Sequence, residues 1–240
     1  MALTPVRIAT LYDSPTPDPD TQSKLVIEGY RQTPERTPAM PLQRRPHTLS
    51  ELTGPLEQTR RLKMLGADIA SEAGARAIGQ VILVKLRILD EDGAPVPGTV
   101  VEMWQANAAG RYVHPNDDDH APIDPHFYGA ARVQTDESGA IAIRTIKPGA
   151  YAVPDTGGWW RPPHIHFSVW GKIWLARTVT QMLFPGEPLN DQDRILLAVP
   201  SAEARSRLVC RMLAPTGDPK DALVFEHDIV VRGARATPQA

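Results

Sequence analysis

Apolar and polar residues alternate in several short segments of the chain from residue 80 onward. The segment 80–89, QVILVKLRIL, alternates and is rich in β-branched residues, which is typical of a half-buried strand. DEDGAPVPG comes next, and its Asp-Gly pair and two prolines predict a turn. Further strands are predicted over 99–107, 135–151, 163–171, 176–184 and 222–233. Short strands separated by Gly- and Pro-containing turns predict an antiparallel β-sandwich.

Helical patterns are scarce. Only AEARSRLVCRML, residues 202–213, carries apolar residues spaced toward one face of a helix, namely Leu208, Met212 and Leu213. Residues 56–75 favour no particular structure, and the chain contains no internal repeat. The predicted fold is therefore mainly β, an antiparallel sandwich with long connecting loops and few short helices.

The N-terminal fifth of the chain differs in composition from the rest. Residues 1–50 are rich in Pro, Thr, Arg and Gln, with TPERTPAMPLQRRP as the extreme case. A segment of this kind does not pack a core of its own, so it forms either a disordered tail or an arm laid over another surface. We expect an extended N-terminal arm over 1–50 and one β-sandwich domain over 51–240.

Composition and charge exclude several classes of partner. The formal net charge is −2 and no long basic run occurs, which argues against binding to nucleic acid or to a membrane surface. The single cysteine, Cys210, excludes an internal disulfide and metal sites built from several thiolates. The sequence contains neither a signal-peptide pattern near its start nor an apolar run approaching ~18 residues. We expect a soluble cytoplasmic protein.

Two histidines lie one residue apart in WWRPPHIHFSVWG, residues 159–171. On a strand, residues i and i+2 project to the same face, so His164 and His166 point together while Ile165 points away. Two neutral imidazoles on one face form half of a metal site. They could equally be a hydrogen-bonded pair on a half-buried strand, so the rest of the chain has to decide.

Two tyrosines are candidates to complete such a site. Tyr112 and Tyr151 each follow a glycine-containing turn, where a side chain can be aimed inward. A free phenol has a pKa near ~10, but a hard trivalent cation can remove its proton at neutral pH. Two phenolates with two imidazoles therefore favour iron(III). Each tyrosine alone is as well explained as an amphipathic core residue. The other histidines are more typical of surface or hydrogen-bonded positions: His47, His114, His120, His126 and His227.

Four segments together resemble the intradiol ring-cleavage dioxygenases, in the order and spacing of that family. They are VPGTVVEMWQANAAGRYVH, ARVQTDESGAIAIRTIKPGAY, WWRPPHIHFSVWG and TQMLFPGEPLNDQDRI. The resemblance covers most of residues 50–234 and is strongest to the iron-bearing chain of the members that cleave protocatechuate. It implies a prealbumin-like sandwich and a ferric iron held by four residues: Tyr112, Tyr151, His164 and His166.

The resemblance also implies an activity and its catalytic residues. Protocatechuate (3,4-dihydroxybenzoate) would be opened by O2 to 3-carboxy-cis,cis-muconate, a step of aromatic catabolism in the β-ketoadipate pathway. Tyr151 would act as a releasable ligand and base, and Arg161 would stabilise negative charge on the ring. Gln181 would lie on the O2 side of the site. Arg161 could instead be a structural residue paired with an acid, and Gln181 an ordinary polar strand residue.

Further residues match positions around the family's substrate pocket. Trp104 and Ile195 match its walls, although a plain core role fits both as well, and Tyr30 of the arm would contact the substrate. One position departs from the family pattern, because the tyrosine matching Tyr151 is usually followed by Pro-Trp and here by Ala-Val. Val153 should therefore widen the pocket, unless the nearby Trp159 and Trp160 compensate.

The resemblance implies partners and leaves alternatives open. It implies an α chain in an α/β assembly, together with a catecholic substrate and O2. A second interpretation keeps the chemistry and changes the substrate to catechol or hydroxyquinol, although such relatives usually carry a helical N-terminal domain that this Pro-rich arm does not resemble. A third is a non-catalytic binding or scaffold chain, against which the complete ligand set argues.

Overall fold

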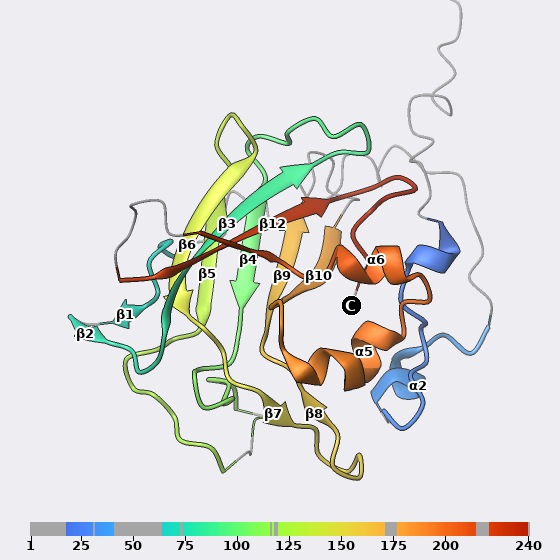
Figure 1. Ribbon diagram of the computed structural model, residues 1–240, viewed down its shortest axis with the longest axis horizontal. Coiled ribbons are helices and arrows are strands. Elements are labelled where there is room, and N and C mark those ends of the chain that lie inside the picture. Colours follow the sequence, from blue (N-terminus) through green and yellow to red (C-terminus); the bar gives the residue numbers. More distant parts are fainter. Residues whose placement is uncertain are drawn as a thin grey trace, which may run out of the picture.

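The computed structural model describes residues 18–30, 32–40, 64–72, 74–115, 117, 120–170, 177–214 and 221–239. Two four-stranded sheets form its body, in the orders β10-β9-β4-β5 and β11-β12-β3-β6 (Figure 1). Their strands are β3 (Val81–Leu89), β4 (Val100–Trp104), β5 (Ala130–Gln134), β6 (Ala140–Ile146), β9 (His164–Trp170), β10 (Arg177–Leu183), β11 (Arg211–Leu213) and β12 (Leu223–Val230). The predicted antiparallel sandwich is confirmed, with one parallel pair, β12 and β3.

The core lies between the two sheets and follows the alternation of the sequence. Strand β3 buries every second residue, and these side chains meet the inner face of the other sheet. The fully buried members include Ile82, Leu86, Met103, Ile165 and Phe167. Each such side chain contributes roughly 1.5–3 kcal/mol when it leaves water. The residues between them on each strand therefore point outward, away from the core.

Residues 64–70 close one side of the sandwich. Leu65 N–H donates to the carbonyl of Arg132 in β5, at 3.0 Å, and Ile69 N–H donates to the carbonyl of Arg144 in β6, at 2.8 Å. One short segment thus satisfies backbone groups on an edge strand of each sheet, which covers part of both edges. Two small ribbons complete the strands: β1 (Ser71–Glu72) with β2 (Ala75–Arg76), and β7 (Tyr151–Ala152) with β8 (Trp160–Arg161).

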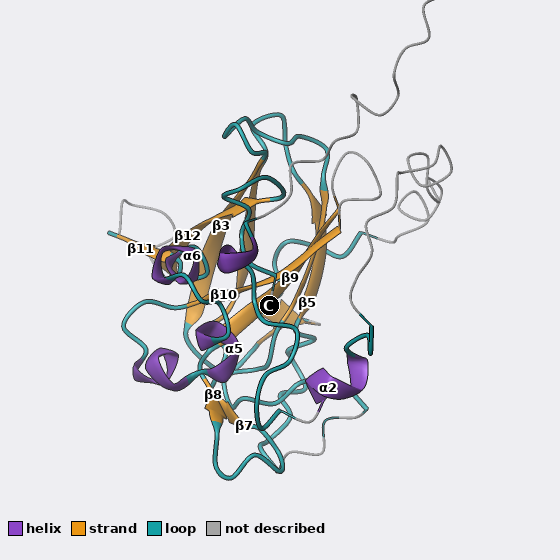
Figure 2. Ribbon diagram, turned by 90° about the vertical axis from the view of Figure 1, so that its right-hand side faces the viewer, coloured by secondary structure: helices purple, strands orange, loops and turns teal. Residues whose placement is uncertain are grey.

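The described helices are short and lie outside the sheets, and most of the remaining described chain is loop (Figure 2). They are η1 (Pro19–Thr21), α2 (Gln32–Arg36), η2 (Pro188–Gln192), α5 (Arg194–Leu197) and α6 (Ala202–Ser206). Asp193 caps α5 and Ser201 caps α6, each through a side-chain oxygen that accepts a backbone N–H. No helix of the described residues is long and apolar enough to cross a membrane.

The prediction of one helix over 202–213 is wrong. Helix α6 ends at Ser206, and residues 211–213 form strand β11 against β12. The intervening backbone pairs instead with Leu183, whose N–H donates to Leu208 O at 2.7 Å and whose carbonyl accepts from Cys210 N–H at 2.9 Å. Leu208 is buried, but Met212 is 52% exposed, so the apolar spacing did not mark one helical face.

The described part of the arm lies against the region of α5 and α6 (Figure 1). Lys24 N–H donates to the carbonyl of Ala198 at 3.0 Å, and Ser201 N–H donates to the carbonyl of Asp20 at 3.1 Å. The alternative of an arm laid over another surface is thus the one seen for residues 18–30. The predicted boundary near residue 50 lies outside the described residues and stays a prediction.

Candidate metal centre and substrate pocket

His164 and His166 lie on the outer face of the sheet that contains β9. Ile165 between them points into the core, so both imidazoles face the other way, as the alternation predicts. Their Nε2 atoms are 3.2 Å apart. Register places His166 directly between Gln181 of β10 and Trp104 of β4, so three site candidates form one row across the sheet. The Trp104 ring stacks on His166, with centroids 4.9 Å apart and an interplanar angle of 4°.

The two tyrosines complete the cluster. The hydroxyl oxygens of Tyr112 and Tyr151 each lie 3.4 Å from His164 Nε2. Neighbouring ligands of a metal with bonds of ~2.1 Å are themselves separated by ~3 Å, so these spacings suit a common ion. Among the described residues no group of three or more His, Cys, Asp or Glu side chains forms a metal site. The phenols are therefore needed to make this one.

Two glycines allow the loops that carry the tyrosines to touch backbone to backbone. A Cβ on Gly149 would lie 2.4 Å from Ala108 O and 2.6 Å from Gly110 N. Gly110 itself has φ of 87°, a conformation that favours glycine. Asn107 joins the two loops, because its backbone carbonyl accepts hydrogen bonds from the N–H groups of Gly110, at 3.0 Å, and Gly149, at 2.9 Å. The separation of the two phenols is thus set by backbone contact.

Each tyrosine is also held by its own backbone. Tyr112 N–H donates to Asp117 Oδ2 at 2.7 Å. Tyr151 opens the β7–β8 ribbon and pairs with Arg161. Directly opposed residues of an antiparallel pair project to the same face, so Arg161 and Tyr151 point together. Pro162 and Pro163 separate β8 from β9, because a proline lacks the N–H that a ladder bond requires.

All four side chains are neutral when no cation is bound, because the pKa values of the imidazoles are lowered and those of the phenols are raised. His164 Nδ1–H donates to the carbonyl of Pro162 at 2.7 Å, so the Nε2 lone pair faces the cluster. Burial lowers the pKa of His164 well below its usual range and that of His166 to about 3, and the charge of Arg161 adds to both shifts. Burial also raises the pKa of the Tyr112 phenol well above its usual value. Converging neutral imidazoles and ionisable phenols suit a hard, highly charged cation.

A cavity of about 660 Å³ opens beside this cluster. Six of the predicted catalytic and pocket residues line it: Tyr30, Trp104, Tyr151, Arg161, Gln181 and Ile195. No Asp or Glu is among the described lining residues, whereas Lys24 of the arm is. The cavity therefore favours an anionic or neutral guest.

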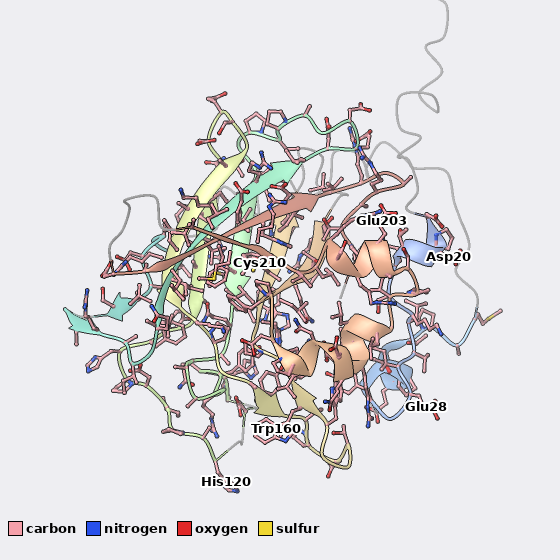
Figure 3. The ribbon with its side chains drawn as sticks, viewed as in Figure 1. Asp20, Glu28, His120, Trp160, Glu203 and Cys210 are labelled. Atoms are coloured by element: carbon pink, nitrogen blue, oxygen red, sulfur yellow. The ribbon has the colours of Figure 1, made fainter. Side chains whose placement is uncertain are left out.

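Val153 is not among the lining residues. Its side chain is half-buried, and its N–H donates to the carbonyl of Trp159 at 2.9 Å. Trp159 is itself buried and meets the Tyr30 ring edge-on, with centroids 5.4 Å apart. Trp159 thus supports a cavity wall from behind, whereas Trp160 is 48% exposed at the edge of the molecule (Figure 3). The effect of Val153 on the pocket stays a prediction.

A buried ion pair holds Arg161. Its Nε donates to Asp193 Oδ1 at 2.9 Å, and its Nη2 donates to Gln181 Oε1. Asp193 is fully buried, and the sequence reasoning missed it. Its sequence signal is that of a helix cap, an aspartate two residues before the apolar run Ile195–Leu197.

The remaining histidines lie elsewhere. His114 and His120 are exposed, the latter at the outer edge of the molecule (Figure 3), and His227 lies in β12 of the opposite sheet. His126 is half-buried in the loop before β5, and His47 lies outside the described residues. The expected surface position agrees with His114 and His120. It is wrong for His227, which is buried and whose Nε2 has no hydrogen-bond partner among the described residues. That none of these histidines is a ligand stays a prediction.

Comparison with known proteins identifies the family. The family described as Dioxygenase matches residues 53–233. The chain is 43% identical over 232 residues to the protocatechuate 3,4-dioxygenase beta chain of Burkholderia cepacia, a match that covers 94% of this chain and 98% of that one. The chain belongs to the intradiol dioxygenase family.

Two further members of the intradiol dioxygenase family are similar to this chain. The protocatechuate 3,4-dioxygenase alpha chain of B. cepacia is 31% identical over 168 residues, which are 69% of this chain and 79% of that one. The structure of catechol 1,2-dioxygenase from Acinetobacter, inhibited by bound mercury, superposes with a TM-score of 0.52 at 26% identity over 71% of this chain and 60% of that one. Members of the family are generally non-heme iron enzymes, which agrees with the donor set described above.

Proposed function

We propose that this protein is the iron-bearing chain of a protocatechuate 3,4-dioxygenase. It would open protocatechuate between the two hydroxylated ring carbons with O2, giving 3-carboxy-cis,cis-muconate. The observation that carries the proposal is the convergence of two phenol oxygens and two imidazole nitrogens beside a cavity. The identity to the beta chain of B. cepacia, which spans nearly the whole length of both chains, supports this choice within the family.

In this proposal Tyr112, Tyr151, His164 and His166 hold ferric iron. The bound ion supplies a Lewis acid that keeps the phenols ionised and prepares a catechol for reaction with O2. Tyr151 is the residue we assign to accept a proton from a catechol hydroxyl. Burial raises the pKa of its phenol when no metal is bound, so a Tyr151 phenolate released from the ion would be readily protonated.

The other cavity residues orient the ring and respond to its charge. Arg161 lies on the same face of the ribbon as Tyr151, where its guanidinium can stabilise negative charge that develops on the ring. Trp104 holds the plane of the His166 imidazole by stacking and forms part of the wall. Ile195 and the arm residue Tyr30 also line the cavity, where they help to exclude water.

The charges of the cavity favour a carboxylate-bearing catechol. Lys24 lines the cavity and makes no ion pair with a described residue, and no acid faces it there. A benzoate carboxylate would gain from this ammonium, whereas catechol and hydroxyquinol have no such group. Those two substrates remain the alternative. The observation against them is that this chain matches only 60% of the length of the catechol 1,2-dioxygenase, whereas it matches 98% of the beta chain.

Oxygen uptake tests the function directly. The purified protein is supplied in parallel with protocatechuate, catechol and hydroxyquinol, and the ring-opened product is followed by its ultraviolet spectrum. We expect uptake with protocatechuate and about one iron per chain, together with a broad visible band from phenolate coordination. A colourless protein that is fully active with zinc bound would contradict the assignment.

We also propose an α chain as partner. The relatives include both an alpha and a beta chain of such an enzyme, and three apolar side chains before β5, Val113, Ile123 and Tyr128, are 48%, 60% and 57% exposed. The mass in solution, measured by light scattering for the chain alone and after co-expression with the α chain of the same source, tests this. A fully active, stable monomer without partner would argue against it.

A further inference from the structure

We propose that Asp193 is a positioning residue, which fixes the Arg161 guanidinium in the orientation that serves the substrate. The inference rests on the proposed function, since it concerns the residue assigned there to the ring charge. It is carried by the geometry of a buried ion pair between the β7–β8 ribbon and the start of α5.

The pair is withdrawn from water. Arg161 is 3% exposed and Asp193 is 0% exposed. A guanidinium in such surroundings requires a partner, because an unpaired buried charge is costly. Asp193 supplies two contacts, from Nε to Oδ1 at 2.9 Å and from Nη2 to Oδ2 at 3.4 Å. Gln181 accepts a second hydrogen bond from Nη2.

These contacts leave one nitrogen for a ligand. Nε and Nη2 point at protein acceptors, whereas Nη1 has no hydrogen-bond partner among the described residues. Arg161 lines the cavity, so Nη1 is the group left to meet a bound molecule. A planar guanidinium held along one edge keeps its opposite edge in a fixed direction.

Asp193 is fixed by a second set of bonds. Its Oδ2 accepts the N–H of Leu196 at 3.3 Å, and its carbonyl accepts the N–H of Leu197 at 2.9 Å. The carboxylate therefore cannot follow the arginine if that side chain turns. The next residue, Arg194, donates to the carbonyls of Gly29 in the arm and Thr156 in the loop after β7, both at 3.3 Å. One short stretch thus anchors the arm and the guanidinium together.

A double-mutant cycle tests whether Asp193 and Arg161 act as one unit. It compares four proteins: wild type, Asp193→Asn, Arg161→Ser and the double variant. Asn keeps the size of the side chain and an oxygen for the α5 cap but lacks the charge. We expect Asp193→Asn to keep its iron and visible band, to lose roughly 10-fold in kcat, and to change KM little. In the Arg161→Ser background the same change should alter kcat less than about twofold.

A matched control separates positioning from stability. Ser201→Ala removes the equivalent capping bond of α6, from Ala204 N–H, at a residue whose side chain does not touch Arg161. Its kcat should stay at the wild-type value even though the protein unfolds at lower urea concentration. Arg161→Lys keeps the charge and one contact, so it should recover part of the turnover that is lost in Arg161→Ser. If Arg161→Ser does not fold, Arg161→Lys takes its place in the comparison.

The outcomes are distinguishable. Normal kcat in Asp193→Asn, or losses that multiply in the double variant, would overturn the positioning role. If the wild type opens none of the three catechols, the proposed function fails, and urea unfolding of the four iron-free proteins then decides the pairing. If the shift in urea midpoint of the double variant differs from the sum of the two single shifts, the result supports the positioning of Arg161 by Asp193. If the shifts are additive, the result overturns it.

Discussion

Gly149→Ala tests how far the metal centre depends on the backbone contact between the two tyrosine loops. The new Cβ would lie 2.4 Å from Ala108 O and 2.6 Å from Gly110 N, well inside the 3.4 Å at which ordinary contact begins. Both neighbours are backbone atoms, so they cannot rotate away. Gly149 does not have a positive φ, which leaves the clash as the cause. The loops must separate by about 1 Å, a distance that also breaks the Gly149 N–H bond to Asn107 O.

Strain together with a lost buried hydrogen bond amounts to about 2–4 kcal/mol of unfolding free energy. The same displacement moves Tyr151 away from Tyr112, so iron content and the visible band should fall together. Urea unfolding, metal analysis and the visible spectrum measure these effects. Gly66→Ala is the control, because a Cβ there meets nothing within 4 Å. A Gly149→Ala protein with wild-type stability and full iron would refute the reasoning.

Three further changes test separate parts of the molecule. Tyr112→Phe removes one phenolate and should abolish much of the visible absorbance, whereas unchanged colour would exclude Tyr112 as a ligand. Lys24→Gln should raise KM for protocatechuate several-fold and leave catechol turnover unchanged; equal effects on both would argue against a carboxylate contact. Burial lowers the pKa of His227 from 6.5 to about 4, so the folded state excludes a proton that the unfolded chain accepts. The neutral, buried His227 therefore contributes up to about 3 kcal/mol to the free energy of unfolding. This contribution is present above pH 6.5 and is lost as the pH falls toward 4. His227→Leu should show a correspondingly weaker fall in urea midpoint over that window than the wild type, and parallel curves would exclude this role.

The sequence could predict the elements whose side-chain pattern is local. Alternation located β3 and the strand that carries His164 and His166, and the glycine-containing turns marked Tyr112 and Tyr151. It failed where tertiary pairing overrides local spacing. Residues 211–213 form an edge strand against β12 although their apolar residues have a helical period.

Asp193 was missed for a related reason. Its sequence context predicts a helix cap, and the cap is indeed made. Nothing in the neighbouring residues indicates that the same carboxylate faces Arg161, thirty-two positions earlier in the chain. A capping oxygen that also neutralises a buried charge can be found only once the loops that bring the two residues together are known.

The two halves of the site depend on different parts of the chain, and this separates chemistry from substrate choice. The four metal-ligand candidates lie within residues 112–166 and are placed by strand register and by contacts between adjacent loops. Another part of the cavity wall comes from the arm and from α5, which are joined by the bond between Arg194 and Gly29, 165 positions apart. Changes in the arm can therefore alter the shape and charge of the cavity without moving a ligand. Relatives with the same metal chemistry can thus diverge in substrate through this wall, and Lys24 and Tyr30 are the residues of this chain at which such divergence should be sought.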